Sequence, residues 1–277
     1  MKPCVSQAVV MASAFQDDLN AFARAGFPAM EIWLTKLEQA LESSTIERIQ
    51  EKIAQSGVQP VAAAGQSGLL LSQGEERRLH WEQFRRRLGW LRVLGTETLI
   101  LAADPGAGFV AERFGEVLTA LREAADLAAE FGVRLALEFQ ARSRFCASLD
   151  TAAALVAQAG RANLGICLDA FHYYVGPSKF EDLALLSRNN LAWIQLCDLA
   201  GAPRELAGDP DRILPGDGDF QLAAILEQCH QIGYDGYVSL ETLNPLFWRI
   251  APERVADVGF QALARVLEQA DQRRSGA

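Results

Sequence analysis

The chain has 277 residues and a formal net charge of −9, with 50% hydrophobic and 22% charged residues. This composition supports a large core, and it excludes both an extensively disordered chain and a membrane helix of about 20 uncharged apolar residues. The negative charge disfavours a protein that binds by neutralising phosphates, so we expect no nucleic-acid partner and no membrane partner. The first residues lack the apolar stretch of a secretory signal, which favours a cytoplasmic protein.

The cysteine and histidine counts limit the kinds of site that the chain can build. The five cysteines are odd in number and form no C-x-x-C pair, so we expect reduced, mostly buried thiols. Three histidines are too few for a site that needs many imidazoles. The cysteines are Cys4, Cys146, Cys167, Cys197 and Cys229.

Short apolar runs recur along the chain, and most follow an amphipathic helical pattern and a small residue or glycine. The glycine predicts a left-handed helix end, and the apolar run predicts a strand buried on both faces. Residues 109–131 and 148–159 are two examples of the intervening helices. The runs are 5–10, 25–34, 56–65, 94–103, 131–139, 161–169, 190–198 and 232–241.

Eight strand–helix units of parallel type predict an α/β fold, a single (β/α)8 TIM barrel. The rival is a doubly wound open sheet, which often carries a glycine-rich phosphate loop, and no GxGxxG follows a strand here. We expect one domain over residues 1–272 and a polar tail over 273–277. Residues 200–218 form a long loop after the seventh strand, and loops of this length are usually functional.

Polar side chains follow four consecutive predicted strands, at the carboxyl ends where barrel enzymes place their active sites. Burying several carboxylates together is unfavourable unless a cation neutralises them. A divalent metal is the simplest solution, and oxygen ligands favour Mn²⁺ or Mg²⁺. The four expected ligands, on strands five to eight, are Glu138, Asp169, Gln195 and Glu241.

The series ALEF, LDAFH, IQLCD, PGDG and SLE resembles the xylose isomerase-like TIM-barrel sugar isomerase/epimerase superfamily, most of all its inosose (2-keto-myo-inositol) isomerase-like members. The resemblance reaches from near the N-terminus to about Leu267 and is strongest between Glu138 and Glu241. It implies that Glu138, Asp169 and Glu241 bind the metal. It also implies that His172 and Arg212 hold the substrate.

Gln195 departs from the family pattern, because most members have histidine there. Some 3-dehydroshikimate dehydratases of the superfamily also have glutamine, but they usually carry an arginine-bearing PFRDFE-like segment after strand three. Here residues 60–67 read PVAAAGQS, which weakens the dehydratase interpretation. Asp198, three residues further on, either orients a ligand or Arg212 without contacting the metal itself, or caps its loop.

The resemblance implies an isomerase or epimerase of a ketose or keto-cyclitol. Proton abstraction next to the carbonyl would give a metal-bound enediolate, with Glu138 and Glu241 as the acid–base pair. The alternatives are a metal-dependent lyase, a phosphate-cleaving nuclease and a non-catalytic sugar-binding protein. We expect a small sugar or cyclitol as the binding partner, and the sequence is compatible with either a monomer or a homo-oligomer. We also expect four residues at the pocket mouth: Glu31, Trp33, Gln66 and Trp248.

Overall fold

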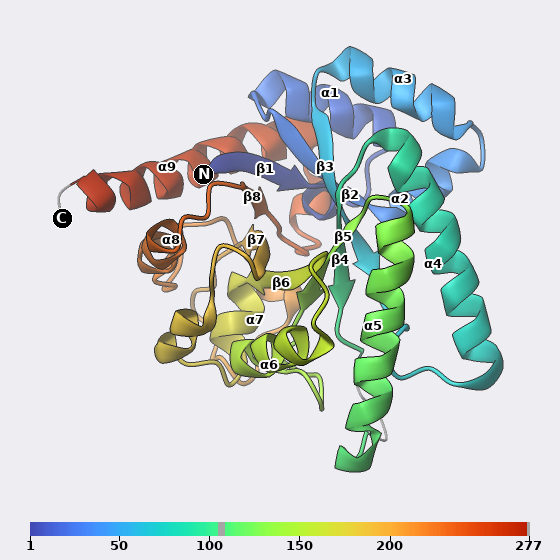
Figure 1. Ribbon diagram of the computed structural model, residues 1–277. Coiled ribbons are helices and arrows are strands. Elements are labelled where there is room, and N and C mark those ends of the chain that lie inside the picture. The colour runs from blue at the N-terminus through green and yellow to red at the C-terminus, as the bar shows by residue number, and fades with distance from the viewer. Residues whose placement is uncertain (105–108, 276–277) are drawn as a thin grey trace.

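Eight parallel strands close into a barrel in the computed structural model, which describes residues 1–104 and 109–275 (Figure 1). Each strand pairs with its neighbour in the sequence, and the last strand pairs with the first. This order confirms the (β/α)8 barrel. The strands are β1 (Lys2–Ser6), β2 (Ala29–Trp33), β3 (Gln59–Gln66), β4 (Thr98–Ala102), β5 (Arg134–Glu138), β6 (Leu164–Asp169), β7 (Leu191–Leu196) and β8 (Tyr237–Leu240).

Helices surround the barrel and cover its outer face (Figure 1). No helix in the described ranges is long and apolar enough to cross a membrane. The last helix reaches Ser275, into the segment 273–277 that the sequence marks as a polar tail. The α-helices are α1 (Phe15–Ala25), α2 (Leu34–Leu41), α3 (Ile46–Ser56), α4 (Gly74–Leu94), α5 (Phe114–Glu130), α6 (Leu149–Ala159), α7 (Ala170–Val175), α8 (Leu222–Gln231) and α9 (Pro252–Ser275).

The predicted helix ends are confirmed at the glycines that precede strands. Gly26 and Gly95 cap α1 and α4 with φ values of 92° and 72°, a backbone region that side chains with a Cβ seldom adopt. The first strand lies earlier than the expected range 5–10. It ends at Ser6, whose hydroxyl accepts the N–H of Ala8 and starts a 3₁₀ turn, η1 (Gln7–Val10).

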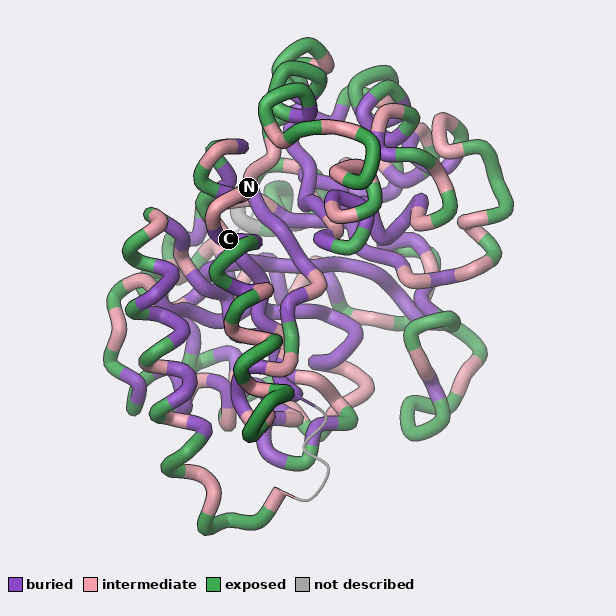
Figure 2. The backbone as a smooth tube through the Cα atoms, turned by 90° about the vertical axis from the view of Figure 1, so that its right-hand side faces the viewer, coloured by how far each residue is buried: buried purple, intermediate pink, exposed green. Residues whose placement is uncertain are grey.

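Alternation along the strands separates two kinds of buried surface. A large leucine-rich cluster packs between the strands and the helices. A second cluster joins mostly small side chains on several strands to Ile100 and the ring of Trp193. Figure 2 shows the same organisation, with buried strands inside a partly exposed shell of helices. The small residues leave room for a polar layer at the carboxyl ends of the strands.

The loop after β7 folds back over that polar layer. Its return segment pairs with the end of the strand through an antiparallel bridge between Asp198 and Ile213. Arg142, in the loop after β5, donates to the carbonyl of Ala207 at 3.1 Å and ties the two loops together. As a result, Arg212 is only 1% exposed although it lies in a loop.

Candidate metal and substrate site

Three acidic side chains meet at the carboxyl ends of the barrel strands. Glu138 is the last residue of β5, Asp169 is the last of β6, and Glu241 directly follows β8. All three are buried, with exposed fractions of 7%, 0% and 3%. The sequence therefore identified residues that the fold brings together in one buried site.

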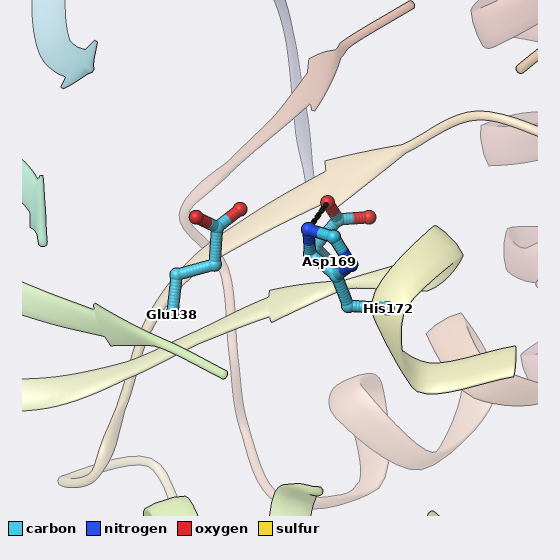
Figure 3. Close-up of side chains that lie close together, drawn as sticks. All are labelled: Glu138, Asp169 and His172. Atoms are coloured by element: carbon cyan, nitrogen blue, oxygen red, sulfur yellow. Dashed lines mark ion pairs between the residues drawn. The ribbon is translucent and has the colours of Figure 1, made fainter. Parts of the chain in front are cut away.

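His172 lies in the first turn of α7, the helix that begins directly after Asp169. Its Nε2 is 3.7 Å from Asp169 Oδ2, and Glu138 faces this pair from β5 (Figure 3). Ligand atoms of Glu138, Asp169 and His172 all lie within 4.8 Å of one another, a spacing that a single metal ion could bridge. Burial lowers the pKa of His172, which favours the neutral imidazole.

Arg212 reaches two of the three acidic residues, Asp169 and Glu241, from the loop after β7. Its Nη1 lies 2.9 Å from Asp169 Oδ2 and 3.0 Å from Glu241 Oε2, while Nη2 lies 3.4 Å from His172 Nε2. Asp209 Oδ1 accepts a hydrogen bond from Arg212 Nη2 at 2.9 Å. The two residues expected to hold the substrate, His172 and Arg212, are thus neighbours of the expected metal ligands.

Gln195 is on β7, between the second and the fourth expected ligand. Its Nε2 donates to Glu241 Oε1 at 2.9 Å and to Glu31 Oε1 at 3.1 Å. Its amide oxygen accepts from the Cys167 thiol at 3.1 Å. The side chain therefore contacts Glu241 as a hydrogen-bond donor in this structure.

The acidic side chains differ in their electrostatic surroundings. Burial raises the pKa of both Glu138 and Glu241 well above the usual range, and neighbouring carboxylates add to the effect. Burial also acts against the charge of Asp169, but Arg212 and His172 outweigh it, and the net pKa of Asp169 is lowered. One guanidinium thus faces several buried carboxylates, and this oxygen-rich donor set fits a divalent cation.

Glu31 does not line the pocket mouth, as the sequence suggested, but lies inside the barrel with no exposed surface. It accepts from Trp193 Nε1 at 2.7 Å as well as from Gln195. A glutamate within the apolar run 25–34 was the available signal, because a strand buried on both faces should carry a charge only for a reason. Gln66 is also buried, and its Oε1 accepts a hydrogen bond from Arg87 Nη1 at 3.1 Å.

The contacts of Asp198 favour loop capping over direct contact with Arg212. Its carboxylate accepts the backbone N–H groups of Leu199, Gly216 and Phe220 at 2.9–3.0 Å. These contacts fix the start and the end of the loop that carries Arg212. A cavity of about 100 Å³ lies beside His172 and is lined in part by Ala207, Gly208 and Asp209 of this loop.

Comparison with known proteins gives a consistent assignment. The family model for the xylose isomerase-like TIM barrel matches residues 19–266. The inosose isomerase of Bacillus velezensis is 25% identical over 269 residues, covering 91% of this chain and 92% of the relative. A 3-dehydroshikimate dehydratase of Pseudomonas aeruginosa is 26% identical over 264 residues, covering 94% of this chain but 41% of that larger protein.

Solved structures support the same fold. The IolI protein, crystallised with a binding zinc atom, superposes with a TM-score of 0.92 at 22% identity, covering 98% of this chain and 99% of the other. At this identity the superposition establishes the fold rather than the reaction. It supports the same barrel architecture over nearly the whole chain.

Proposed function

The chain belongs to the xylose isomerase-like TIM barrel family, and we propose that it is a divalent-metal-dependent isomerase or epimerase of a ketose or keto-cyclitol, with an inosose as the first candidate substrate. One observation carries the proposal. Glu138, Asp169 and Glu241 converge, buried, at the carboxyl ends of the strands, with His172 and Arg212 against them.

The metal would be held by the three carboxylates. Gln195 is the fourth expected member of the set, and its oxygen would join the ligands only after the amide turns, because its nitrogen now faces Glu241. A bound divalent metal supplies a Lewis acid that polarises a carbonyl and the neighbouring hydroxyl. We propose Mn²⁺ or Mg²⁺, because carboxylate and amide oxygens suit these ions.

The two glutamates supply the acid–base chemistry. One carboxylate removes the proton from the carbon next to the carbonyl, and the pair of electrons left behind moves toward the carbonyl oxygen. Return of a proton to the opposite face of the same carbon gives an epimer. Return to the former carbonyl carbon, together with transfer of the hydroxyl proton to the former carbonyl oxygen, gives an isomer. In the metal-free site, burial raises the pKa of both glutamates, which makes each carboxylate a stronger base than an exposed one.

Arg212 and His172 bind and orient the substrate in this proposal. Arg212 remains charged, because Asp169 and Glu241 outweigh the effect of its burial on the pKa of the guanidinium. It can therefore donate to a developing negative oxygen. The loop that carries Arg212 buries its guanidinium almost completely, so this hydrogen-bond donor is shielded from bulk water.

A dehydratase is the second candidate, supported by the relative from Pseudomonas aeruginosa. The first step is shared, and a β-hydroxyl then leaves in place of the second protonation. A product assay separates the two reactions. We would incubate the protein with Mn²⁺ and a panel of inososes, ketoses and 3-dehydroshikimate, and follow products by NMR in deuterated water and by ultraviolet absorbance.

An isomerase or epimerase incorporates solvent deuterium and gives a product of unchanged formula, whereas a dehydratase gives a product that has lost one water and has a new ultraviolet absorption band. Absence of both for every compound, with the metal bound, would contradict the proposal. We further propose that the protein acts in the cytoplasm, because its five cysteines are all free and buried. Its place in carbohydrate metabolism follows from the proposed substrate class.

A further inference from the structure

Glu31 is a carboxylate enclosed in the barrel, below the acidic cluster. It has no exposed surface, and two neutral N–H groups on β7 donate to it. Trp193 Nε1 donates to Oε2 at 2.7 Å, and Gln195 Nε2 donates to Oε1 at 3.1 Å. Each carboxylate oxygen therefore holds a different side chain of the same strand.

The amide of Gln195 has all its bonding groups engaged. Both N–H groups of Nε2 face carboxylates, Glu31 and Glu241, and the amide oxygen accepts from Cys167. If the amide turned end for end without a nearby cation, its oxygen would face two carboxylates and its N–H groups would face a thiol. Glu31 therefore accepts one of the two N–H···carboxylate hydrogen bonds that set the orientation of the Gln195 amide.

Trp193 lies between Glu31 and the amino end of the barrel. Its ring, 2% exposed, forms part of the wall of a cavity of about 550 Å³ at the amino end of the barrel. Its Nε1 points to Glu31, so the ring separates that carboxylate from the cavity. A buried carboxylate is unfavourable compared with an apolar side chain of the same size, which suggests a role other than filling space.

We propose that Glu31 is a positioning residue, which holds the amide of Gln195 and, through it, the carboxylate of Glu241 in the metal site. The inference rests on the proposed function in so far as Glu241 binds a metal. It adds a residue on β2 to a site otherwise built from β5 to β8 and the loops that follow them.

Mn²⁺ binding to metal-free protein, measured by calorimetry, tests the proposal without any substrate. Glu31→Met keeps the length of the side chain and removes both acceptor oxygens. We expect the Mn²⁺ dissociation constant to rise about 10- to 100-fold, the usual effect of losing a residue that orients a ligand. Glu31→Gln keeps one acceptor oxygen and should restore most of the affinity.

A double-mutant cycle asks whether Glu31 acts through Gln195. If it does, Glu31→Met should add little to the loss caused by Gln195→Ala, because the amide to be held is already gone. Additive losses, or an unchanged affinity in Glu31→Met, would overturn the proposal. Asp18→Asn is the matched control: Asp18 is also fully buried, but it pairs with Lys36 and Gln7 away from the site. This variant should bind Mn²⁺ like the wild type.

A second readout does not depend on metal binding. In metal-free protein with ¹⁵N-labelled glutamine side chains, the Gln195 amide can be assigned from its absence in Gln195→Ala. We expect two distinct, slowly exchanging protons in the wild type and fast exchange in Glu31→Met. Equal protection in both proteins would overturn the proposal. If the wild type binds no divalent metal, the proposed function fails, while this measurement still decides the role of Glu31.

Discussion

Arg212 and Asp169 form a buried ion pair at the end of β6, with 2.9 Å between Nη1 and Oδ2 and exposed fractions of 1% and 0%. The same nitrogen is 3.0 Å from Glu241 Oε2. One guanidinium thus links two of the three expected carboxylate ligands. Because Glu138 and Glu31 lie close by without a cation of their own among the described contacts, the site should be sensitive to any change in positive charge.

Removal of divalent metal should destabilise the protein and abolish turnover. Several buried carboxylates then face one arginine, and their mutual repulsion raises the free energy of the folded state. We expect EDTA to lower the melting temperature in differential scanning fluorimetry, and Mn²⁺ to restore both stability and activity. Full activity in a preparation shown by elemental analysis to be metal-free would contradict the metal assignment.

Arg212→Met should destabilise the metal-free protein by about 3–5 kcal/mol, because it leaves buried carboxylates without their partner. Urea unfolding measures the change. Arg265→Met is a suitable control, since Arg265 pairs with Asp217 at 3.3 Å on the exposed surface and such pairs contribute about 0–1 kcal/mol. Similar losses in the two variants would mean that the ion pairs of Arg212 add little to stability.

Glu138→Gln and Glu241→Gln should each reduce turnover by at least about 10³-fold while the fold is retained. An amide keeps an oxygen near the metal but cannot accept the proton from carbon. Exchange of the substrate's α-proton with deuterated water, followed by NMR, should stop as well. Near-normal exchange in either variant would show that the substituted glutamate is not the base.

Much of this site could be predicted from the sequence because a parallel barrel places strand ends together. The acid at the end of each apolar run is enough to locate Glu138, Asp169 and Glu241. The orientation of a side chain within the site could not be predicted in this way. The Gln195 amide depends on Glu31 and Cys167, which are 164 and 28 positions away, and nothing in the local pattern states which end of the amide faces which partner.

The first strand shows the same limit on a local scale. The apolar run 5–10 continues past Ser6, so the pattern alone extends the strand. The Ser6 hydroxyl instead accepts the N–H of Ala8 and starts a 3₁₀ turn. A serine in an apolar run is compatible both with a longer strand and with a turn, because its hydroxyl can accept a nearby backbone N–H.

Asp18 should make stability depend on pH. Burial raises its pKa from 3.8 to about 6, although Lys36 acts in the opposite direction. Between these pH values the folded state binds more protons than the unfolded state, so the unfolding free energy falls as pH rises from about 4 to 6. The change from this group alone is about 3 kcal/mol.

Asp18→Asn mimics the protonated form and should lack this contribution. Urea unfolding of both proteins at pH 4.5 to 7 measures it, as a steady gain of the variant relative to the wild type with rising pH. A constant difference across the range would show that Asp18 does not titrate there.

Gln195→His should shift the metal preference toward Zn²⁺ or Co²⁺. Gln195 lies against Glu241, and whether it donates from nitrogen, as here, or turns its oxygen to the metal, β7 supplies no nitrogen ligand. An imidazole would supply one, and Glu31 is placed to accept its second N–H. Nitrogen ligands favour Zn²⁺ and Co²⁺ over Mg²⁺ and Mn²⁺.

Calorimetric titration of both proteins with the four metals gives the ratios of the dissociation constants, and the ratio of the Mn²⁺ to the Zn²⁺ dissociation constant should rise in the variant. An equal ratio in the two proteins would mean that residue 195 lies outside the coordination sphere in either form, and that the expected set of ligands is one residue too long.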